Sequence, residues 1–213
     1  MVGDLYKMNL LKRYAIFFSG IILISFGIVL CAKSDLGLAP VSSVPYVFSS
    51  IFPVSFGAFT FIFNILMLSV QVVILKGKLP AVQYLQVIIV LIFGMCIDAF
   101  ARLLAPIEIE SYMSRITVLF IGCIMQAFGV SLEVMADVLV LPGDGVVKTI
   151  SNVYNKEFGM VKVSFDILML AVSAVFSVLC LRKIIGVGEG SIIASITIGR
   201  MAKFFIKKIK IYI

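Results

Sequence analysis

The sequence predicts an all-α membrane protein with six transmembrane helices arranged as two inverted three-span repeats. The first observation is composition: 62% of the 213 residues are hydrophobic and 14% are charged, which leaves too little polar surface for a soluble domain. The second is an internal duplication of the chain. The third is the odd number of spans in each copy, which turns the second copy upside down in the membrane relative to the first.

The duplication has a constant offset of 102 residues. The segment Phe128–Gly159 repeats Phe26–Gly57, and a three-residue shift then extends the match so that Gly94 falls on Gly199. Internal repeats of this kind decide the architecture before other signals are used. We therefore divide the chain into a first repeat, 1–107, and a second repeat, 108–213. The paired positions include Asp35 with Asp137, Pro40 with Pro142, Asn64 with Asp166 and Phe56-Gly57 with Phe158-Gly159.

The transmembrane helices are predicted from apolar stretches of sufficient length. About 20 helical residues are needed to cross a hydrocarbon layer about 30 Å thick. Two further segments, 40–52 and 143–155, are too short and too polar to cross comfortably. The six stretches that qualify are 14–32, 57–75, 82–101, 116–135, 160–181 and 190–206.

The first short segment predicts a re-entrant hairpin over residues 36–56. Residues 36–39 read as extended because a proline restricts the residue before it. Pro40 suits the first turn of a helix, and Ser42 or Ser43 could cap its free amides. Such a hairpin is stable inside a membrane only where protein or water covers its backbone. An ordinary external loop is the alternative.

The second hairpin, 138–158, carries a clearer turn signature. The run Pro142-Gly143-Asp144-Gly145 is followed by a weakly amphipathic segment that contains Lys148. If the repeats are inverted, the two hairpins enter from opposite faces and their helix N-termini converge near the midplane. Each N-terminus would offer unpaired amide donors and about half a positive charge.

The basic residues predict the orientation. Six spans with both termini inside place ten basic residues in the cytoplasm and five outside, which follows the positive-inside rule. Eight spans, with both short segments crossing, give nine against six. The net charge of +7 is thus explained by topology, and no nucleic-acid partner is expected. The inner set is Lys7, Lys12, Arg13, Lys76, Lys78, Lys148, Lys156, Lys207, Lys208 and Lys210, and the outer set is Lys33, Arg102, Arg115, Arg182 and Lys183.

The sequence lacks the motifs that are typical of several classes of protein. The chain has no histidine and no CxxC pair, so neither a metal site nor a cofactor is expected. Nucleophile–histidine pairs, Walker sequences and dinucleotide fingerprints are also missing, which argues against an enzyme. The first span lacks a small-residue cleavage pattern and is read as retained. Cys31, Cys96, Cys123 and Cys180 are expected to be buried thiols.

Ionisable residues inside apolar spans are costly and are therefore functional candidates. Glu133 and Asp137 lie at i and i+4, where mutual repulsion would favour uptake of a proton. Lys162 and Asp166 have the same spacing and could form an ion pair. The alternatives are that Glu133 and Asp137 are simply hydrated near the boundary, and that Lys162 extends to the interface.

Charges at the ends of the other spans read mainly as structural. Asp98 and Arg102 predict an interfacial pair near the outer end of the third span. Glu189 at the start of the last span, with Arg200 and Lys203 toward its end, suits the helix dipole.

A glycine in the first span, the Asp-x-Gly-x-x-Pro stretch from Asp35 to Pro40 and the aliphatic span that follows resemble the YczE/YyaS/YitT group of small bacterial membrane proteins. Pro142-Gly143-Asp144-Gly145 with Phe158-Gly159, and Gly188-Glu189-Gly190-Ser191, resemble one subgroup of it. The tryptophan that follows the proline in related members is absent, since Val41 and Gly143 stand there. The resemblance implies a bacterial integral membrane protein and brings no settled activity.

Together these features predict a proton- or cation-coupled secondary transporter for a small polar solute in the bacterial cytoplasmic membrane. A channel-like pore and a non-transporting binding or regulatory protein remain alternatives, and a homodimer is left open. Converging helix N-termini favour an anionic solute, whereas the aspartates of the hairpins favour a cationic or neutral one. Coupling is assigned to Glu133, Lys162 and Asp166. The expected solute contacts are Lys33, Asp35, Pro40, Ser42, Ser43, Asn64, Asp137, Pro142, Gly143, Asp144, Gly145 and Lys148.

Overall fold

The computed structural model describes residues 9–209, which form eight α-helices and one 3-10 helix. No strand occurs among these residues. The elements are α1 (Leu10–Ser34), α2 (Pro40–Ile51), α3 (Phe56–Ile74), η2 (Ala81–Leu85), α4 (Gln86–Leu103), α5 (Tyr112–Ala136), α6 (Pro142–Val153), α7 (Phe158–Leu181) and α8 (Glu189–Ile209).

Five of the expected six spans are long and apolar enough to cross a membrane: Leu10–Ser34, Phe56–Ile74, Ala81–Leu103, Tyr112–Ala136 and Phe158–Leu181. The chain is therefore a multi-pass membrane protein. The stretch expected as a sixth span is the helix α8, which is 21 residues long but carries four basic residues in its C-terminal half. Those residues, Arg200, Lys203, Lys207 and Lys208, keep α8 out of the set of candidate spans.

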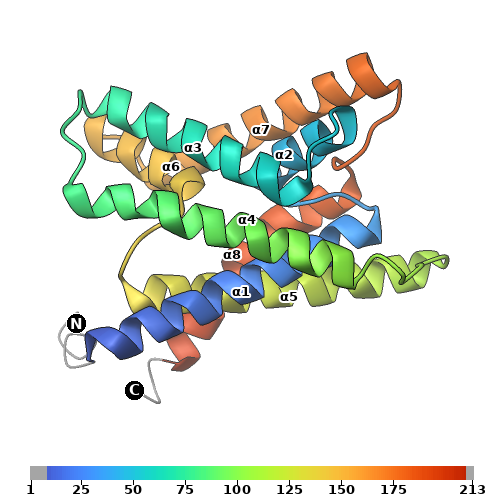
Figure 1. Ribbon diagram of the computed structural model, residues 1–213, viewed down its shortest axis with the longest axis horizontal. Helices are drawn as coiled ribbons and strands as arrows, with labels where there is room; N and C mark the ends of the chain where they lie inside the picture. Colours follow the sequence, from blue (N-terminus) through green and yellow to red (C-terminus); the bar gives the residue numbers. More distant parts are fainter. Residues whose placement is uncertain (1–8, 210–213) are drawn as a thin grey trace.

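Two hydrophobic clusters divide the helices into two layers (Figure 1). One cluster joins α1, α4, α5 and α8, with Phe17, Phe93, Leu119 and Ala194 among its buried members. The other joins α2, α3, α6 and α7. Six of its seven buried side chains are equivalent in pairs at an offset of 102: Val44 and Val146, Phe63 and Phe165, Met67 and Met169.

The helices α1 and α5 run antiparallel and form the most extensive contact between helices in the described chain. Glycines allow their backbones to approach closely. A Cβ on Gly20 would lie 2.8 Å from the carbonyl oxygen of Gly129, and a Cβ on Gly27 would lie 2.6 Å from that of Gly122. Small residues at a membrane helix interface commonly permit such packing. Larger side chains at these four positions would push the two helices apart.

The short helices α2 and α6 lie toward opposite ends of the molecule, α2 on the right and α6 on the left in Figure 1. Both begin with a proline in the first turn, which was predicted for Pro40. The run Pro142-Gly143-Asp144-Gly145 was predicted to be a turn before the helix, but it forms the first turn of α6 itself. Each follows a residue in the left-handed conformation that ends the preceding helix: Asp35 has a φ of 55° and Asp137 a φ of 45°. Aspartate is one of the few non-glycine residues that tolerate this conformation.

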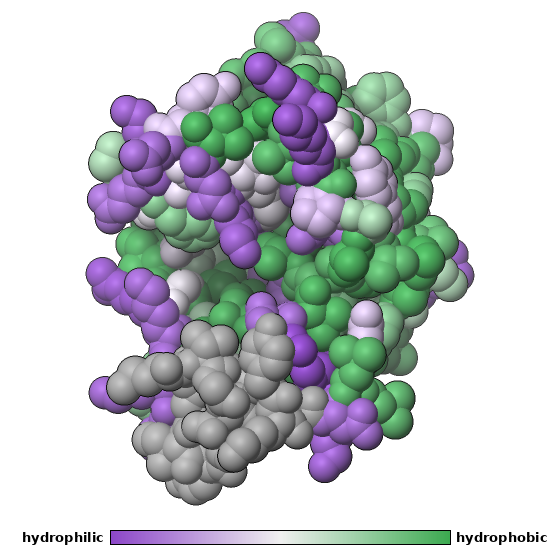
Figure 2. Space-filling view, turned by 90° about the vertical axis from the view of Figure 1, so that its left-hand side faces the viewer, coloured by the Kyte–Doolittle hydropathy of each residue, from purple (hydrophilic) through white to green (hydrophobic). Residues whose placement is uncertain are grey.

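The outer surface carries many large hydrophobic side chains, including Ile167 and Leu179 on α7, which are 63% and 69% exposed. Figure 2 shows hydrophilic side chains projecting over hydrophobic surface at the end of the molecule where α6 lies. In a membrane protein such apolar surface is the part that contacts lipid tails. Within the apolar 18-residue stretch of each helix, the share of buried residues is 50% in α1 and α5 and 17% in α7, so α1 and α5 are central and α7 is peripheral.

Candidate functional site at the tips of the short helices

The N-terminal ends of α2 and α6 meet inside the protein; we call this region the tip site. A Cβ on Gly143 would lie 2.9 Å from Cγ1 of Val41, and these two residues are equivalent under the 102-residue offset. Both short helices lack a side-chain cap at their N-termini. The first-turn amides of the two helices therefore gather in one place, where they can act as hydrogen-bond donors.

Gln71 of α3 reaches across to the tip of α6. Its Nε2 donates a hydrogen bond to the carbonyl oxygen of Pro142 at 3.2 Å, and its side chain is buried. A Cβ on Gly145 would lie 2.8 Å from both amide heteroatoms of Gln71. At the equivalent place in the other half, Ser173 and Ser43 are both buried serines. The contact of Gln71 with Gly145 is thus equivalent to the pair Ser173 and Ser43, so a glutamine and a glycine at one tip correspond to two serines at the other.

Three charged side chains form a cluster beside the tip of α6. The Nζ of Lys162 on α7 lies 3.0 Å from a carboxylate oxygen of Asp144 and 3.0 Å from one of Asp166. The ion pair of Lys162 with Asp166 along α7 was predicted, and it is confirmed. The bridge to Asp144 on α6 was not predicted. It ties the peripheral helix α7 to the first turn of α6.

Glu133 is buried in α5, with 6% of its surface exposed. Its Oε1 accepts a hydrogen bond of 2.9 Å from the backbone N–H of Leu141, the residue before α6. A carboxylate therefore holds the extended arm 138–141 of the second hairpin. Asp137, in contrast, points outward with 74% of its side chain exposed. Glu133 and Asp137 therefore have different environments, and the predicted repulsion between them as a shared acidic pair is not supported.

The extended arm of the first hairpin is held by backbone bonds instead. The N–H of Leu38 donates to the carbonyl oxygen of Gly186 at 3.1 Å, and the N–H of Gly190 donates to that of Leu36 at 2.8 Å. A Cβ on Gly190 would lie 2.8 Å from the same oxygen of Leu36. This arm packs directly on the start of α8, so the two arms are fixed by different chemistry.

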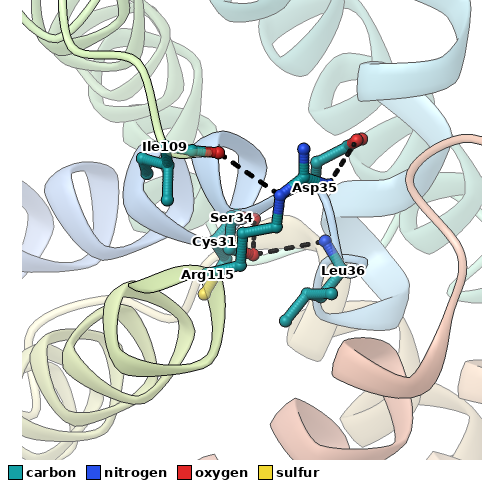
Figure 3. Close-up of polar contacts among 6 residues, drawn as sticks. All are labelled: Cys31, Ser34, Asp35, Leu36, Ile109 and Arg115. Atoms are coloured by element: carbon teal, nitrogen blue, oxygen red, sulfur yellow. Dashed lines mark hydrogen bonds and ion pairs between the residues drawn. The ribbon is translucent and has the colours of Figure 1, made fainter. Parts of the chain in front are cut away.

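Arginine–aspartate pairs close both ends of the α1–α5 contact. Arg115 at the start of α5 lies 3.2 Å from Asp35 at the end of α1 and also donates to the carbonyl oxygen of Ile109 at 3.3 Å (Figure 3). Arg13 in α1 lies 3.7 Å from Asp137 at the end of α5. Its guanidinium also donates to the carbonyl oxygens of Ala136, at 2.8 Å, and of Asp137.

Several predicted solute contacts lie away from the tip site. The Nζ of Lys33 donates to the carbonyl oxygens of Ala105 and Ile107, at 3.0 and 2.9 Å, in the loop after α4. Lys148 is exposed on α6, and Asp35 is exposed and bound to Arg115. The structure instead gathers Pro40, Pro142, Gly143, Asp144 and Gly145 at the two short-helix N-termini, with Ser42 and Ser43 in the first turns of α2. Asn64 is buried within α3 and donates to the carbonyl oxygen of Thr60 at 2.8 Å.

Two local predictions are wrong. Ser42 and Ser43 do not cap α2; the hydroxyl of Ser43 donates to the carbonyl oxygens of Ala39 and Pro40, at 3.2 and 3.0 Å. Asp98 does not pair with Arg102. Its carboxylate accepts hydrogen bonds from the Ser55 hydroxyl at 2.6 Å and from the Gly57 N–H at 2.7 Å. In both cases a nearby backbone group competes successfully for the polar side chain.

The cysteines are only partly as expected. Cys31 and Cys123 are buried, Cys96 is half-buried and Cys180 is exposed, and all four are free thiols. An exposed Cys180 on an outer helix face is compatible with a membrane, because a thiol is a small apolar group that lipid tails can cover. No group of three or more acidic or thiol side chains within residues 9–209 is arranged to hold a metal ion.

Sequence reasoning missed Gln71, Arg13 and Arg115. Gln71 was passed over because an amide in an apolar span is not ionisable. The two arginines were counted only as topology signals, although they are equivalent under the same 102-residue offset as Asp35 and Asp137. The shared offset marks the two arginines and the two aspartates as equivalent pairs, but it does not say which arginine meets which aspartate.

The fold and the apolar surface define the chain as a polytopic helical membrane protein. Residues 11–207 match the model of a protein family whose description is "family of unknown function (DUF6198)". The chain belongs to this family. Searches of curated proteins and of solved structures gave no match. The resemblance to the YczE/YyaS/YitT group therefore stays a prediction.

Proposed function

We propose that the protein is a secondary transporter for a small polar solute, coupled to a proton or another cation. It has six spans in two inverted repeats, 1–107 and 108–213, and the tip site binds the solute near the membrane midplane. The observation that carries the proposal is the meeting of the α2 and α6 N-termini at Val41 and Gly143. Transporter folds with inverted repeats bind solutes at sites made of such broken helices.

The contacts between α1 and α5 support inverted repeats. Under the 102-residue offset, Gly20 is equivalent to Gly122 and Gly27 to Gly129. The contact of Gly20 with Gly129 is therefore equivalent to the contact of Gly122 with Gly27. The ion pairs of Arg13 with Asp137 and of Arg115 with Asp35 exchange in the same way. Two antiparallel helices whose contacts exchange like this are related by a two-fold axis perpendicular to both. For helices that cross a membrane, such an axis lies in the membrane plane.

The short helices support re-entrant hairpins. Each has 12 residues and so is about 18 Å long at 1.5 Å per residue, well short of the roughly 30 Å hydrocarbon core. They lie toward opposite ends of the molecule and meet at their N-termini. The protein covers their loose arms, which is the condition for irregular backbone at membrane depth.

The sixth span is assigned to α8. Its basic residues lie in its second half, with Lys207 and Lys208 in the last turn, where long cationic side chains can extend to the phospholipid headgroups. With α8 crossing, both termini lie on one side. The positive-inside rule places that side in the cytoplasm of a bacterial cell.

The coupling role is assigned to the cluster of Asp144, Lys162 and Asp166, with Glu133 nearby. Charged side chains within spans characteristically mark ion or proton pathways. Lys33 and Lys148 no longer argue for an anionic solute, because neither is at the tip site. The amide donors favour an anion and the carboxylates favour a cation, so the proposal is for a small polar solute. No catalysis is assigned.

The test is solute flux in proteoliposomes with and without a proton gradient, comparing the natural protein with Asp166→Asn. This change introduces the residue that its equivalent, Asn64, already is. We expect Asp166→Asn to fold normally and to lose gradient-driven accumulation by about tenfold or more. The matched control is Asp137→Asn, which changes an exposed carboxylate outside the cluster.

Three other outcomes are informative. Unchanged flux in Asp166→Asn at every pH would remove the coupling role. Flux that ignores the gradient in the natural protein would indicate a channel. Absence of flux for broad pools of anionic, cationic and neutral solutes would leave a binding or regulatory protein and overturn the proposal.

A further inference from the structure

A groove of about 400 Å³ opens on the outside of the protein between α6 and α7. It lies where the two helices meet at the turn 154–157, at the end of the molecule that Figure 2 faces. Its walls are almost entirely apolar, with one cationic residue. The lining residues are Ile150, Lys156, Met160, Val161, Ser164, Phe165 and Leu168.

The equivalent place in the first half of the chain is filled by aromatic rings. Phe48, Phe52 and Phe59 form a cluster there, with ring centroids 6.0 to 6.2 Å apart. Phe48 also packs against Phe176 of α7 at 4.9 Å. These four rings pack together where α2, α3 and α7 meet.

The groove in the second half follows from smaller side chains at the same positions. At an offset of 102 residues, Ile150 replaces Phe48 and Val161 replaces Phe59. Tyr154 replaces Phe52 but does not line the groove, and 62% of its surface is exposed. Ser164 stands where the other half has Ile62. The groove of the second half therefore lies where the first half carries packed aromatic rings.

A hollow on the lipid-facing surface of a membrane protein requires an apolar occupant, because unfilled space forfeits dispersion contacts. Apolarity alone does not select one, since lipid tails are as apolar as the groove walls. Selection comes from Lys156, which is exposed in the groove wall and forms no ion pair within residues 9–209. Exposed Lys148 adds a second cation on α6, and Glu157 places one carboxylate next to Lys156.

We propose that this groove is a binding site for one anionic phospholipid. An acyl chain lies along Val161, Phe165 and Leu168, and the phosphate faces Lys156. The site matches a lipid at the membrane boundary, since the turn that carries Lys156 joins a short helix to a span. Basic residues near a membrane surface attract anionic headgroups. This inference uses only the membrane setting, and it holds whether or not the protein transports a solute.

The test counts lipids bound to the purified full-length protein by native mass spectrometry. Phosphatidylglycerol and phosphatidylcholine with identical acyl chains are titrated separately. We expect the natural protein to retain one phosphatidylglycerol about tenfold more tightly than phosphatidylcholine. Val161→Phe, which introduces the residue of the filled half, should remove this bound lipid. Lys156→Gln should keep a lipid and lose the preference for phosphatidylglycerol.

Two controls keep the result interpretable. Lys78→Gln removes an exposed cation from the turn between α3 and α4, a residue that does not line the groove, and should leave the preference unchanged. Ser164→Ile fills the groove from its exposed rim and serves if Val161→Phe fails to fold. The proposal is overturned if neither filling variant changes the number of bound lipids, or if Lys78→Gln acts like Lys156→Gln. A filling variant that instead changes the monomer–dimer ratio would identify the groove as a contact between two copies, which also overturns it.

Discussion

The helix pairs α3–α4 and α7–α8 occupy equivalent positions in the two halves of the chain, but only α3–α4 is tightly packed. A Cβ on Gly94 would lie 2.5 Å from the carbonyl oxygen of Gly57, whereas a Cβ on Gly199 would meet no atom of residues 9–209 within 4 Å. A Cβ on Gly159 would meet only a carboxylate oxygen of Glu157, at 3.6 Å. Gly57 and Gly94 are thus in contact in the first half, whereas the equivalent Gly159 and Gly199 are not in contact in the second.

A single exchange of charge explains part of this difference. Asp98 of α4 accepts hydrogen bonds from Ser55 and from the N–H of Gly57, which joins α4 to the start of α3. At the 105-residue offset that aligns Gly94 with Gly199, Asp98 is replaced by Lys203 (98 plus 105 gives 203). An ammonium group has only donors, so Lys203 cannot accept the N–H of Gly159.

The proposed transporter would alternate between states that open its solute site to opposite membrane faces. In the inverted arrangement the Gly57–Gly94 contact and the open Gly159–Gly199 position lie toward opposite membrane faces. We propose that the structure represents a state in which α3 and α4 are packed together toward one face while α7 and α8 are apart toward the other. We expect α7 to move during the cycle more than α3, because fewer contacts hold it.

The largest expected effect is the difference in stability between an alanine substitution at Gly57 and one at Gly199. Gly57→Ala should destabilise the protein by about 3 kcal/mol, because its Cβ overlaps the backbone of Gly94 and overpacking costs roughly 1–3 kcal/mol. Gly199→Ala should be neutral or stabilising by up to about 1 kcal/mol, since alanine favours a helix and the site is open. Thermal unfolding in detergent micelles measures both. Equal losses would mean that α8 packs on α7 in the membrane, and the contrast between the halves would disappear.

A smaller difference in stability is expected between substitutions of the two arginines at the ends of the α1–α5 contact. Arg13→Gln should cost about 1.5 kcal/mol, because Arg13 holds the last carbonyl groups of α5 in addition to Asp137, and hydrogen bonds to charged groups contribute roughly 1.5–3 kcal/mol. Arg115→Gln should cost about 0.5 kcal/mol, since its partner Asp35 is exposed and exposed ion pairs contribute roughly 0–1 kcal/mol. The free energies of unfolding of both variants and of Asp35→Asn test this. The order is wrong if Arg115→Gln is the more damaging change.

Much of the fold could be predicted from the sequence, because apolar length and prolines are local signals. The five long spans, the helix that begins at Pro40, and the ion pair of Lys162 with Asp166 all follow from spacing along one segment. The sixth apolar stretch was harder to assign. Its basic second half makes α8 intermediate between a span and a surface helix.

The polar contacts between segments could not be predicted in the same way. Asp98 was assigned to Arg102, one helical turn away, but the folded chain offers it the free N–H of Gly57. Lys33 was placed at the tip because it is close to Asp35 in sequence, yet its long side chain reaches the loop after α4. Helix neighbours can be inferred from spacing, whereas partners on other helices depend on packing that one sequence does not specify.

The central claim is that the two halves are inverted across the membrane, and the most direct test compares equivalent loops. Gly77 lies between α3 and α4, and Lys183 lies between α7 and α8. Single cysteines are placed at these two positions in a protein whose four native cysteines are replaced, and intact cells are treated with a membrane-impermeant thiol reagent. Inverted three-span repeats predict that Lys183→Cys is labelled from outside and that Gly77→Cys is labelled only after the membrane is opened. Labelling of both positions from outside is the result expected if α2 and α6 both cross the membrane. Labelling of both positions from one side, outside or inside, would contradict the inverted repeats and the tip site built on them.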